Sequence, residues 1–99
     1  MIPFHEKVYR IVALVPEGRV TTYAAVASKI GNPASARAVG NALNANPDTK
    51  RTPCHRVVRS DGAVGGYASG TERKVKKLRR EGVKIEKGKV DLMRFGWGL

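Results

Sequence analysis

The sequence predicts a mainly α-helical domain with small β-hairpins, of the winged helix-turn-helix type. Three observations lead to this prediction. Apolar residues recur at helical spacing in four short segments, two of those segments are separated by a Gly-Asn-Pro turn, and an Asp-Gly turn lies between two short apolar stretches. Because 99 residues provide one modest core, residues 1–99 are expected to form a single domain.

The first predicted helix covers residues 3–15, where apolar side chains take one face and charged side chains the other. The Pro-Glu-Gly sequence at 16–18 ends it. A short β-branched stretch follows at residues 20–22. The next helix covers residues 23–30, with Thr22 as its N-cap and a glycine after its last residue.

A further helix is predicted at residues 35–43, after an Asn-Pro pair that forbids continuation of the preceding helix. Asn32 or Ser35 is expected to cap it. Two short helices joined by such a turn predict a helix-turn-helix, with the second helix in the recognition position.

A polar loop at residues 46–52 leads to the stretch that contains the cysteine. Beyond it, residues 57–58 and 63–64 are expected to pair as a hairpin around Asp61-Gly62, and this hairpin is the predicted wing. A glycine-dense loop with one aromatic residue follows at residues 65–70, and it is suited to bring backbone close to a flat ligand.

The last predicted helix covers residues 71–81, capped by Thr71 or Ser69, with Val75 and Leu78 facing the core. Its outer face is expected to carry six cations: Arg73, Lys74, Lys76, Lys77, Arg79 and Arg80.

Two features are expected after this helix. Residues 83–85 and 89–90 are predicted to pair as a second small hairpin. Three apolar residues of the final segment are expected to fold back on the core: Leu92, Phe95 and Trp97.

The composition is strongly basic, with 19 Lys and Arg against 8 Asp and Glu and a net charge of +11. Such a surface favours nucleic acid as partner, although charge alone also permits a solubility, ribosomal or membrane-surface role. One cysteine allows no internal disulfide, and two distant histidines have no metal-ligand spacing, so a reducing compartment and no metal site are expected. No apolar run reaches the roughly 18 residues of a membrane span.

Small residues line the predicted recognition helix: Ala36, Ala38, Gly40 and Ala42. They let either a neighbouring helix or a nucleic-acid backbone approach closely. Arg37 is the one long cation on this helix, and it is interpreted either as a DNA contact or as a solvated surface arginine. The basic run at residues 73–80 has the same two interpretations.

The single cysteine lies between Pro53 and His55, with Arg56 following. A base or a positive charge beside a thiol favours the reactive thiolate, so this stretch is the place to expect thiolate chemistry. Proline before the cysteine fixes the entering backbone. From its position alone, however, a lone cysteine is also consistent with an inert small hydrophobe.

Four blocks in order carry a resemblance. Pro53-Cys54-His55-Arg56-Val57-Val58 is preceded by Arg37-Ala38-Val39-Gly40 and followed by Gly65-Gly66-Tyr67 and Glu81-Gly82. With these spacings the chain resembles, over nearly its whole length, the C-terminal domain of the O6-alkylguanine-DNA alkyltransferases. The resemblance implies DNA repair by direct, irreversible transfer of the alkyl group from O6-alkylguanine to Cys54, as in a single-turnover methylated-DNA-protein-cysteine S-methyltransferase.

The resemblance also implies catalytic roles. His55 acts as base for Cys54 through a water, with Glu81 orienting the imidazole. A mediating water agrees with an extended chain, in which adjacent residues point to opposite sides. Asn46 braces the active-site turn, and Tyr23 donates to the ring of the leaving guanine.

DNA contacts and a substrate pocket follow from the same resemblance. Arg37 enters the base stack in place of the flipped nucleotide. The other implied DNA contacts are Thr22, Ser35, Ala36, Ala38, Gly40 and Arg56. The implied pocket walls are Val57, Val64, Tyr67 and Ala68. No cofactor is implied, because the nucleophile is a side chain and the electrophile arrives on the DNA.

An alternative function comes from the polar loop before the cysteine and the aromatic tail at residues 94–97, which look more like the alkyltransferase-like proteins. Those proteins bind the same lesions, usually carry tryptophan in place of the cysteine and do not transfer the alkyl group. The alternative is therefore a module that flips O6-alkylguanine and marks it for nucleotide-excision repair proteins. Either function implies a monomer that binds double-stranded DNA containing alkylated guanine, in the cytoplasm, nucleoid or nucleus.

Overall fold

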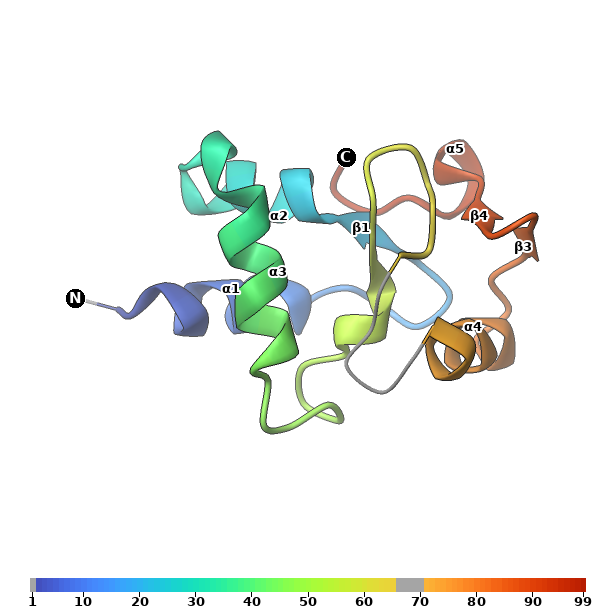
Figure 1. The fold of residues 1–99 in the computed structure, drawn as a ribbon, viewed down its shortest axis with the longest axis horizontal. Coiled ribbons are helices and arrows are strands. Elements are labelled where there is room, and N and C mark those ends of the chain that lie inside the picture. Colours follow the sequence, from blue (N-terminus) through green and yellow to red (C-terminus); the bar gives the residue numbers. More distant parts are fainter. Residues whose placement is uncertain (1, 66–70) are drawn as a thin grey trace.

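The computed structural model describes residues 2–65 and 71–99, and within them it contains five α-helices, two 3₁₀ turns and two small sheets (Figure 1). The predicted mainly helical fold is therefore confirmed. In chain order the elements are α1 (Phe4–Val12), β1 (Thr21–Thr22), α2 (Tyr23–Ile30), η1 (Pro33–Ser35), α3 (Ala36–Asn44), η2 (Cys54–Arg56), β2 (Val57–Val58), α4 (Thr71–Arg80), β3 (Ile85–Glu86), β4 (Lys89–Val90) and α5 (Leu92–Phe95).

The helix-turn-helix is formed by α2, η1 and α3, in the same half of the molecule as α1 (Figure 1). The Thr22 hydroxyl accepts a hydrogen bond from the Ala25 amide at 3.0 Å, which confirms the predicted cap of α2. Gly31, with a φ of 90°, ends the helix in the left-handed region that glycine tolerates. The turn that follows directs α3 back across α2.

The core is divided into two clusters that meet at the parallel pair of β1 and β2. Val57 belongs to the cluster under α1, α2 and α3, whereas Val58 belongs to the cluster under α4 and β3–β4. Neighbouring residues of a strand point to opposite faces, so two residues of β2 join both halves of the core. Both side chains are fully buried.

Two helix predictions need correction. The first helix ends at Val12 rather than at residue 15, because the amides of Leu14 and Val15 bond the carbonyls of Ile11 and Val12 in tight turns. At the start of α3, neither expected cap forms a side-chain hydrogen bond with the helix amides. The short η1 turn stands there instead, and the Ser35 hydroxyl donates to the Asn32 carbonyl at 2.6 Å.

The predicted wing hairpin of residues 57–58 and 63–64 is wrong in its pairing. The turn itself forms, since Arg59 donates its amide to the Ala63 carbonyl at 2.9 Å. However, β2 pairs in parallel with β1, and residues 63–64 bond to residues 88–89 near the start of β4. A parallel partner that lies 36 positions earlier in the chain leaves no local sequence signal, unlike an Asp-Gly turn.

The C-terminal segment agrees with its prediction except at Trp97, which is not among the described residues that pack on either core cluster. β3 and β4 pair antiparallel, and Leu92 and Phe95 pack on the second core cluster. The chain then runs beside Val20, whose amide donates to the Phe95 carbonyl at 2.8 Å and whose carbonyl accepts from the Trp97 amide at 2.7 Å. None of the described helices is long and apolar enough to cross a bilayer.

Gly62 is expected not to tolerate alanine. It has a φ of 87°, and a Cβ atom there would collide with the Val90 carbonyl oxygen. Gly88 also has a positive φ, 74°, but nothing lies within 4 Å of its Cβ position. We expect Gly88→Ala to lower the free energy of unfolding by about 1 kcal/mol, the cost of a left-handed residue, and Gly62→Ala by about 2–4 kcal/mol. Urea unfolding measures both, and equal losses would exclude the collision as the cause.

Candidate active site

Cys54 lies in the η2 turn, 7% exposed, at the junction between α3 and β2. Its amide donates to the Thr52 carbonyl at 2.8 Å, and the Asn46 side-chain amide donates to the same oxygen at 2.9 Å. The Asn46 side-chain oxygen accepts from the Asp48 amide at 3.0 Å. Asn46 thus ties together both ends of the loop that presents the cysteine.

The backbone at Cys54 differs from the extended strand that the sequence led us to expect. Residues 54–56 form a 3₁₀ turn, in which successive side chains are about 120° apart around the axis. Cys54 and His55 therefore still point in different directions, although the reason is the turn and not the alternation of a strand. The strand begins only at Val57.

His55 and Arg56 both bind the carboxylate of Glu81, which directly follows α4. His55 Nε2 lies 3.0 Å from Glu81 Oε2, and Arg56 Nε donates to Glu81 Oε1 at 2.9 Å. A second guanidinium nitrogen of Arg56 donates to Oε2 at 2.5 Å, and the third donates to the Val15 carbonyl at 2.8 Å. A bidentate pair of this kind fixes the plane of the carboxylate and hence the imidazole that it holds.

Burial and charge set the protonation of this group. Burial lowers the pKa of His55 below its usual value, more strongly than the hydrogen bond to Glu81 raises it. Burial alone would raise the pKa of Glu81, but hydrogen bonds from Arg56 and His55 lower it overall. At neutral pH the imidazole is therefore neutral and donates from Nε2 to a carboxylate. Nδ1 then carries the lone pair, and it is buried without a hydrogen-bond partner among the described residues.

Two of the expected DNA contacts lie inside the protein. The Arg56 side chain is 15% exposed, and it holds the Glu81 carboxylate and donates to the Val15 carbonyl. Thr22 is buried, and its hydroxyl caps α2. The resemblance implied a DNA contact at both positions, but in the structure both side chains make internal hydrogen bonds.

Lys74 is a residue of this site that the sequence reasoning missed. It was expected to lie in solvent with the other cations of α4, but it is 0% exposed. Its ammonium group donates to the Tyr23 hydroxyl at 3.4 Å and lies 5.7 Å from the centroid of the Tyr23 ring. The signal was present, because Lys74 lies four positions before the core residue Leu78 and so on the same helix face.

The pKa values of Lys74 and Tyr23 connect them with Cys54. Burial lowers the pKa of Lys74 to about 8, against the opposing effect of negative charge on Cys54. Burial raises the pKa of Tyr23, and negative charge on Cys54 raises it further. Tyr23 therefore remains protonated at neutral pH, and the Lys74 ammonium group is the more acidic of the two.

A second part of the site is an open pocket of about 450 Å³ between α2, α3 and the turn after β2. It brings together three of the predicted site residues, Tyr23, Arg37 and Gly40, with Arg59 on the opposite rim. Gly40 faces the Tyr23 ring, and a Cβ atom there would lie 3.9 Å from it. Ala36 lines the pocket as well, whereas Ala38 is exposed outside it and Ser35 is half-buried.

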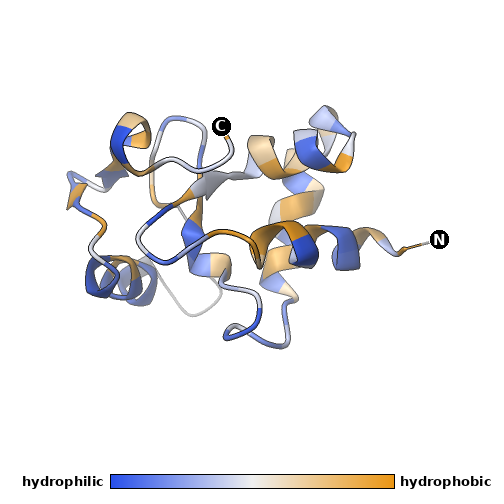
Figure 2. Ribbon diagram, turned by 180° about the vertical axis from the view of Figure 1, so that it is seen from behind, coloured by the Kyte–Doolittle hydropathy of each residue, from blue (hydrophilic) through white to orange (hydrophobic). Residues whose placement is uncertain are grey.

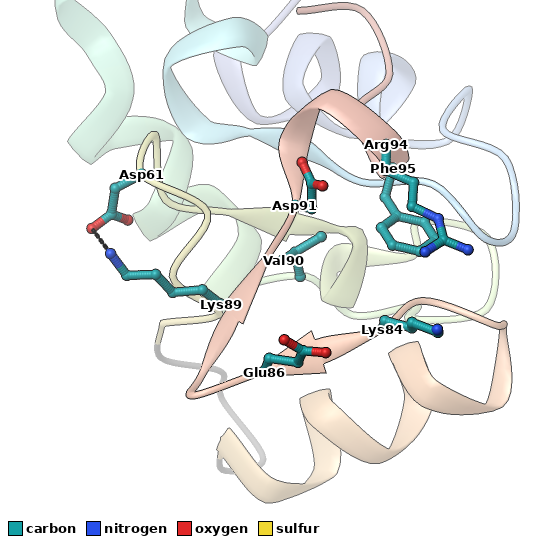
Figure 3. Close-up of a pocket in the computed structure, with 8 residues that line it drawn as sticks. All are labelled: Asp61, Lys84, Glu86, Lys89, Val90, Asp91, Arg94 and Phe95. Atoms are coloured by element: carbon teal, nitrogen blue, oxygen red, sulfur yellow. Dashed lines mark ion pairs between the residues drawn. The ribbon is translucent and has the colours of Figure 1, made fainter.

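The expected substrate pocket is described only in part. Val57 and Val64 are buried, one in each core cluster. Tyr67 and Ala68 lie outside the described residues. Another cavity, of about 320 Å³, lies between the turn at Asp61 and the C-terminal elements and contains none of the predicted site residues (Figure 3). Figure 3 shows both acidic and basic side chains around it.

Comparison with known proteins agrees with this geometry. The family model of the 6-O-methylguanine DNA methyltransferase, DNA binding domain, matches residues 3–83. A methylated-DNA--protein-cysteine methyltransferase of Salmonella typhimurium is 44% identical over 81% of this chain and 47% of its own length. The DNA base-flipping protein of Escherichia coli is 40% identical over 95% of this chain and 74% of its own length.

A solved structure is similar over almost the whole chain. Schizosaccharomyces pombe Atl1, in complex with damaged DNA containing O6-carboxymethylguanine, has a TM-score of 0.86 and 34% identity, over 98% of both chains. The chain spans about a third to about half the length of the first curated relatives it matches. The matched proteins include both methyltransferases and a base-flipping protein. Together with the family model, these identities show that the chain belongs to the 6-O-methylguanine DNA methyltransferase family, in the region of its DNA-binding domain.

Proposed function

We propose that the protein repairs O6-alkylguanine in double-stranded DNA by transferring the alkyl group irreversibly to Cys54. The observation that carries this proposal is the arrangement beside the thiol: a neutral His55 held by Glu81, whose Nδ1 is buried and has no hydrogen-bond partner in residues 2–65 and 71–99. A base with a vacant acceptor beside a cysteine is what a nucleophilic reaction needs. The cysteine methyltransferase among the relatives supports the same reaction.

The first half of the reaction activates the nucleophile. His55 Nδ1 takes the proton of the Cys54 thiol through a water molecule, since the 3₁₀ turn points the two side chains apart. Glu81 stabilises the imidazolium that results, and Arg56 holds Glu81 in place. The thiolate then attacks the alkyl carbon, a sulfur–carbon bond forms, and the bond from that carbon to O6 breaks.

The second half neutralises the leaving guanine. Breaking the bond leaves negative charge on the base, and Tyr23 donates a proton to a ring nitrogen. Lys74 can replace that proton, because its ammonium group contacts the Tyr23 hydroxyl and has a pKa of about 8. The product is a thioether at Cys54 and a repaired guanine, and no cofactor takes part in these steps.

The pocket lined by Tyr23 and Arg37 is the proposed entry for a flipped base. α3 approaches the DNA through the small residues Ala36 and Gly40, which leave room for the backbone. Arg37 is exposed on the first turn of α3, and it is the residue we assign to the gap that the flipped nucleotide leaves in the stack.

A second candidate function is lesion binding without transfer. The likeness to Atl1 over 98% of both chains and the identity with a base-flipping protein favour it. In that case the protein flips O6-alkylguanine and marks it for nucleotide-excision repair proteins. Cys54 would then remain unmodified, although it lies beside a base.

Replacement of Cys54 separates the two functions. With a duplex containing O6-methylguanine, the wild-type protein should gain the mass of one methylene, because a methyl group replaces the thiol proton. Cys54→Ala should gain nothing and yet bind the lesion about as tightly, since binding depends on the pocket and α3. Intact-protein mass spectrometry and a binding titration measure the two. An unmodified wild-type mass with tight binding would establish the second candidate.

Lys74→Met should change both the pH dependence of protein stability and the rate of alkyl transfer. A buried lysine with a pKa of about 8 instead of 10.5 makes wild-type stability rise between pH 8 and 10.5, because only the unfolded chain still binds the proton there. The rise is expected to reach about 3 kcal/mol at most and to disappear in Lys74→Met. Transfer should meanwhile slow several-fold. Urea unfolding of both proteins at pH 7, 8.5 and 10 tests the effect on stability. If the free energy of unfolding depends on pH in the same way for wild type and Lys74→Met, the prediction is wrong.

Arg37→Ala should impair repair of duplex DNA much more than repair of single strands. Only the duplex has a gap to fill, so the transfer rate there should fall several-fold or more, within the few kcal/mol that flipping costs. The salt dependence of binding to undamaged duplex should change little. An equal defect on both substrates, together with a salt slope lower by about one, would instead make Arg37 a phosphate contact.

A further inference from the structure

The positive charge of the chain is concentrated away from the helix-turn-helix. Residues 20–44, which include α2 and α3, carry two cations, Lys29 and Arg37, and no acidic residue. Residues 71–99 carry ten cations and four acidic residues, a net charge of +6 out of the +11 of the whole chain. The proposed DNA-entry face therefore accounts for little of the charge.

Part of that charge forms a stripe on α4. Arg73, Lys76 and Arg80 are exposed and lie three and four positions apart, so their side chains emerge from one face of the helix. By helix geometry they span about 10 Å. Among the described residues, none of the three has an ion-pair partner within 4.0 Å. Like charges at this spacing repel, and binding of a polyanion removes that repulsion.

The α4 stripe, meaning Arg73, Lys76 and Arg80, points away from the proposed active site. Lys74 and Leu78 occupy the opposite face of the helix, and they are buried. In Figure 1 α4 and α3 lie toward opposite ends of the long axis, which measures 39 Å. In Figure 2 the ribbon of α4 is coloured mostly hydrophilic, whereas the helices of the helix-turn-helix include both hydrophilic and hydrophobic segments.

We infer that the α4 stripe is a second DNA-binding surface, which holds the phosphates of a duplex other than the one presented to α3. Its ligand is the phosphate backbone, because three cations on one stripe, with no ion-pair partner in the described part of the chain, match successive phosphates and provide no apolar contact area. The inference rests on the proposed function only in taking duplex DNA as the ligand of α3. Its consequence is that one molecule can bridge two DNA segments.

The mixed-charge cavity beside β3–β4 is not part of this surface. Glu86 and Asp91 line it together with Lys84 and Arg94, so its charges largely cancel (Figure 3). The Lys89 ammonium group lies 3.8 Å from the Asp61 carboxylate. A phosphate backbone gains most where cations are not already compensated, as on the α4 stripe.

A bridging assay tests the inference with undamaged DNA. One short duplex carries a donor dye and a second carries an acceptor, and protein is added at low salt. The variant R73Q/K76Q/R80Q is compared with K7Q/K50Q/R51Q, whose three sites are exposed on α1 and the 46–52 loop. Both variants reduce the net charge by three, and glutamine has nearly the helix propensity of lysine and arginine. Circular dichroism verifies that both are folded.

Wild type and K7Q/K50Q/R51Q should bring the two duplexes together to a similar extent, whereas R73Q/K76Q/R80Q should lose at least about three-fold in energy transfer. The single variant K76Q should lose less than the triple variant. In a 1:1 complex with one short duplex, the salt slope should be the same for all proteins. Equal bridging by both triple variants would overturn the inference, and the α4 stripe would then be a solvent-exposed surface that binds no second duplex. A slope lower by about two or more in the 1:1 complex would also overturn it, since the stripe would then contact the same duplex as α3.

The assay remains informative if alkyl transfer fails. It uses neither a lesion nor the chemistry of Cys54, so an unmodified protein mass would contradict the proposed reaction without affecting the bridging result. Conversely, loss of bridging in both triple variants would show that bridging depends on overall charge, and would overturn the inference about the α4 stripe. Mass spectrometry would still show whether Cys54 accepts an alkyl group.

Discussion

The carboxylate of Glu81 is the interaction on which the rest of the site depends. It joins the end of α4 to the η2 turn through His55 and Arg56, and Arg56 extends the connection to the Val15 carbonyl beyond α1. Segments distant in sequence are thus held by one group. Removing one partner of such a largely buried network leaves an uncompensated charge, which typically costs about 3–5 kcal/mol. The Glu81 carboxylate therefore both orients the His55 imidazole and helps to hold the two halves of the molecule together.

The second constraint is the two-residue strand β2, which directly follows the cysteine turn. Val57 and Val58 are buried in opposite core clusters, so the strand cannot slip by one residue without exchanging the two faces. Its parallel partner β1 ends at Thr22, the cap of α2, and Tyr23 begins that helix. The register of four paired residues consequently fixes the position of Tyr23 relative to Cys54.

The sequence was sufficient for features that depend on local chemistry. The Thr22 cap, the left-handed Gly31 and the small hairpin of β3 and β4 are set by a few neighbouring residues, and each was predicted from them. Features that depend on distant contacts were not accessible in the same way. The parallel pairing of β2 with β1, and the burial of Arg56, follow from which segments meet in space. The resemblance named Cys54, His55 and Glu81, but only the structure shows how Arg56 supports them.

Lys74 is buried next to the candidate active site although an apolar side chain would be the more favourable one to bury there. An apolar residue at that position of α4 would avoid the desolvation that lowers the pKa of the ammonium group to about 8. The lysine instead extends to Tyr23, and its interaction with negative charge on Cys54 is favourable. A tyrosinate at the partly buried Tyr23 would be costly without a nearby cation. In the proposed reaction, the cation next to the tyrosine would therefore let the protein itself return the proton that Tyr23 gives up.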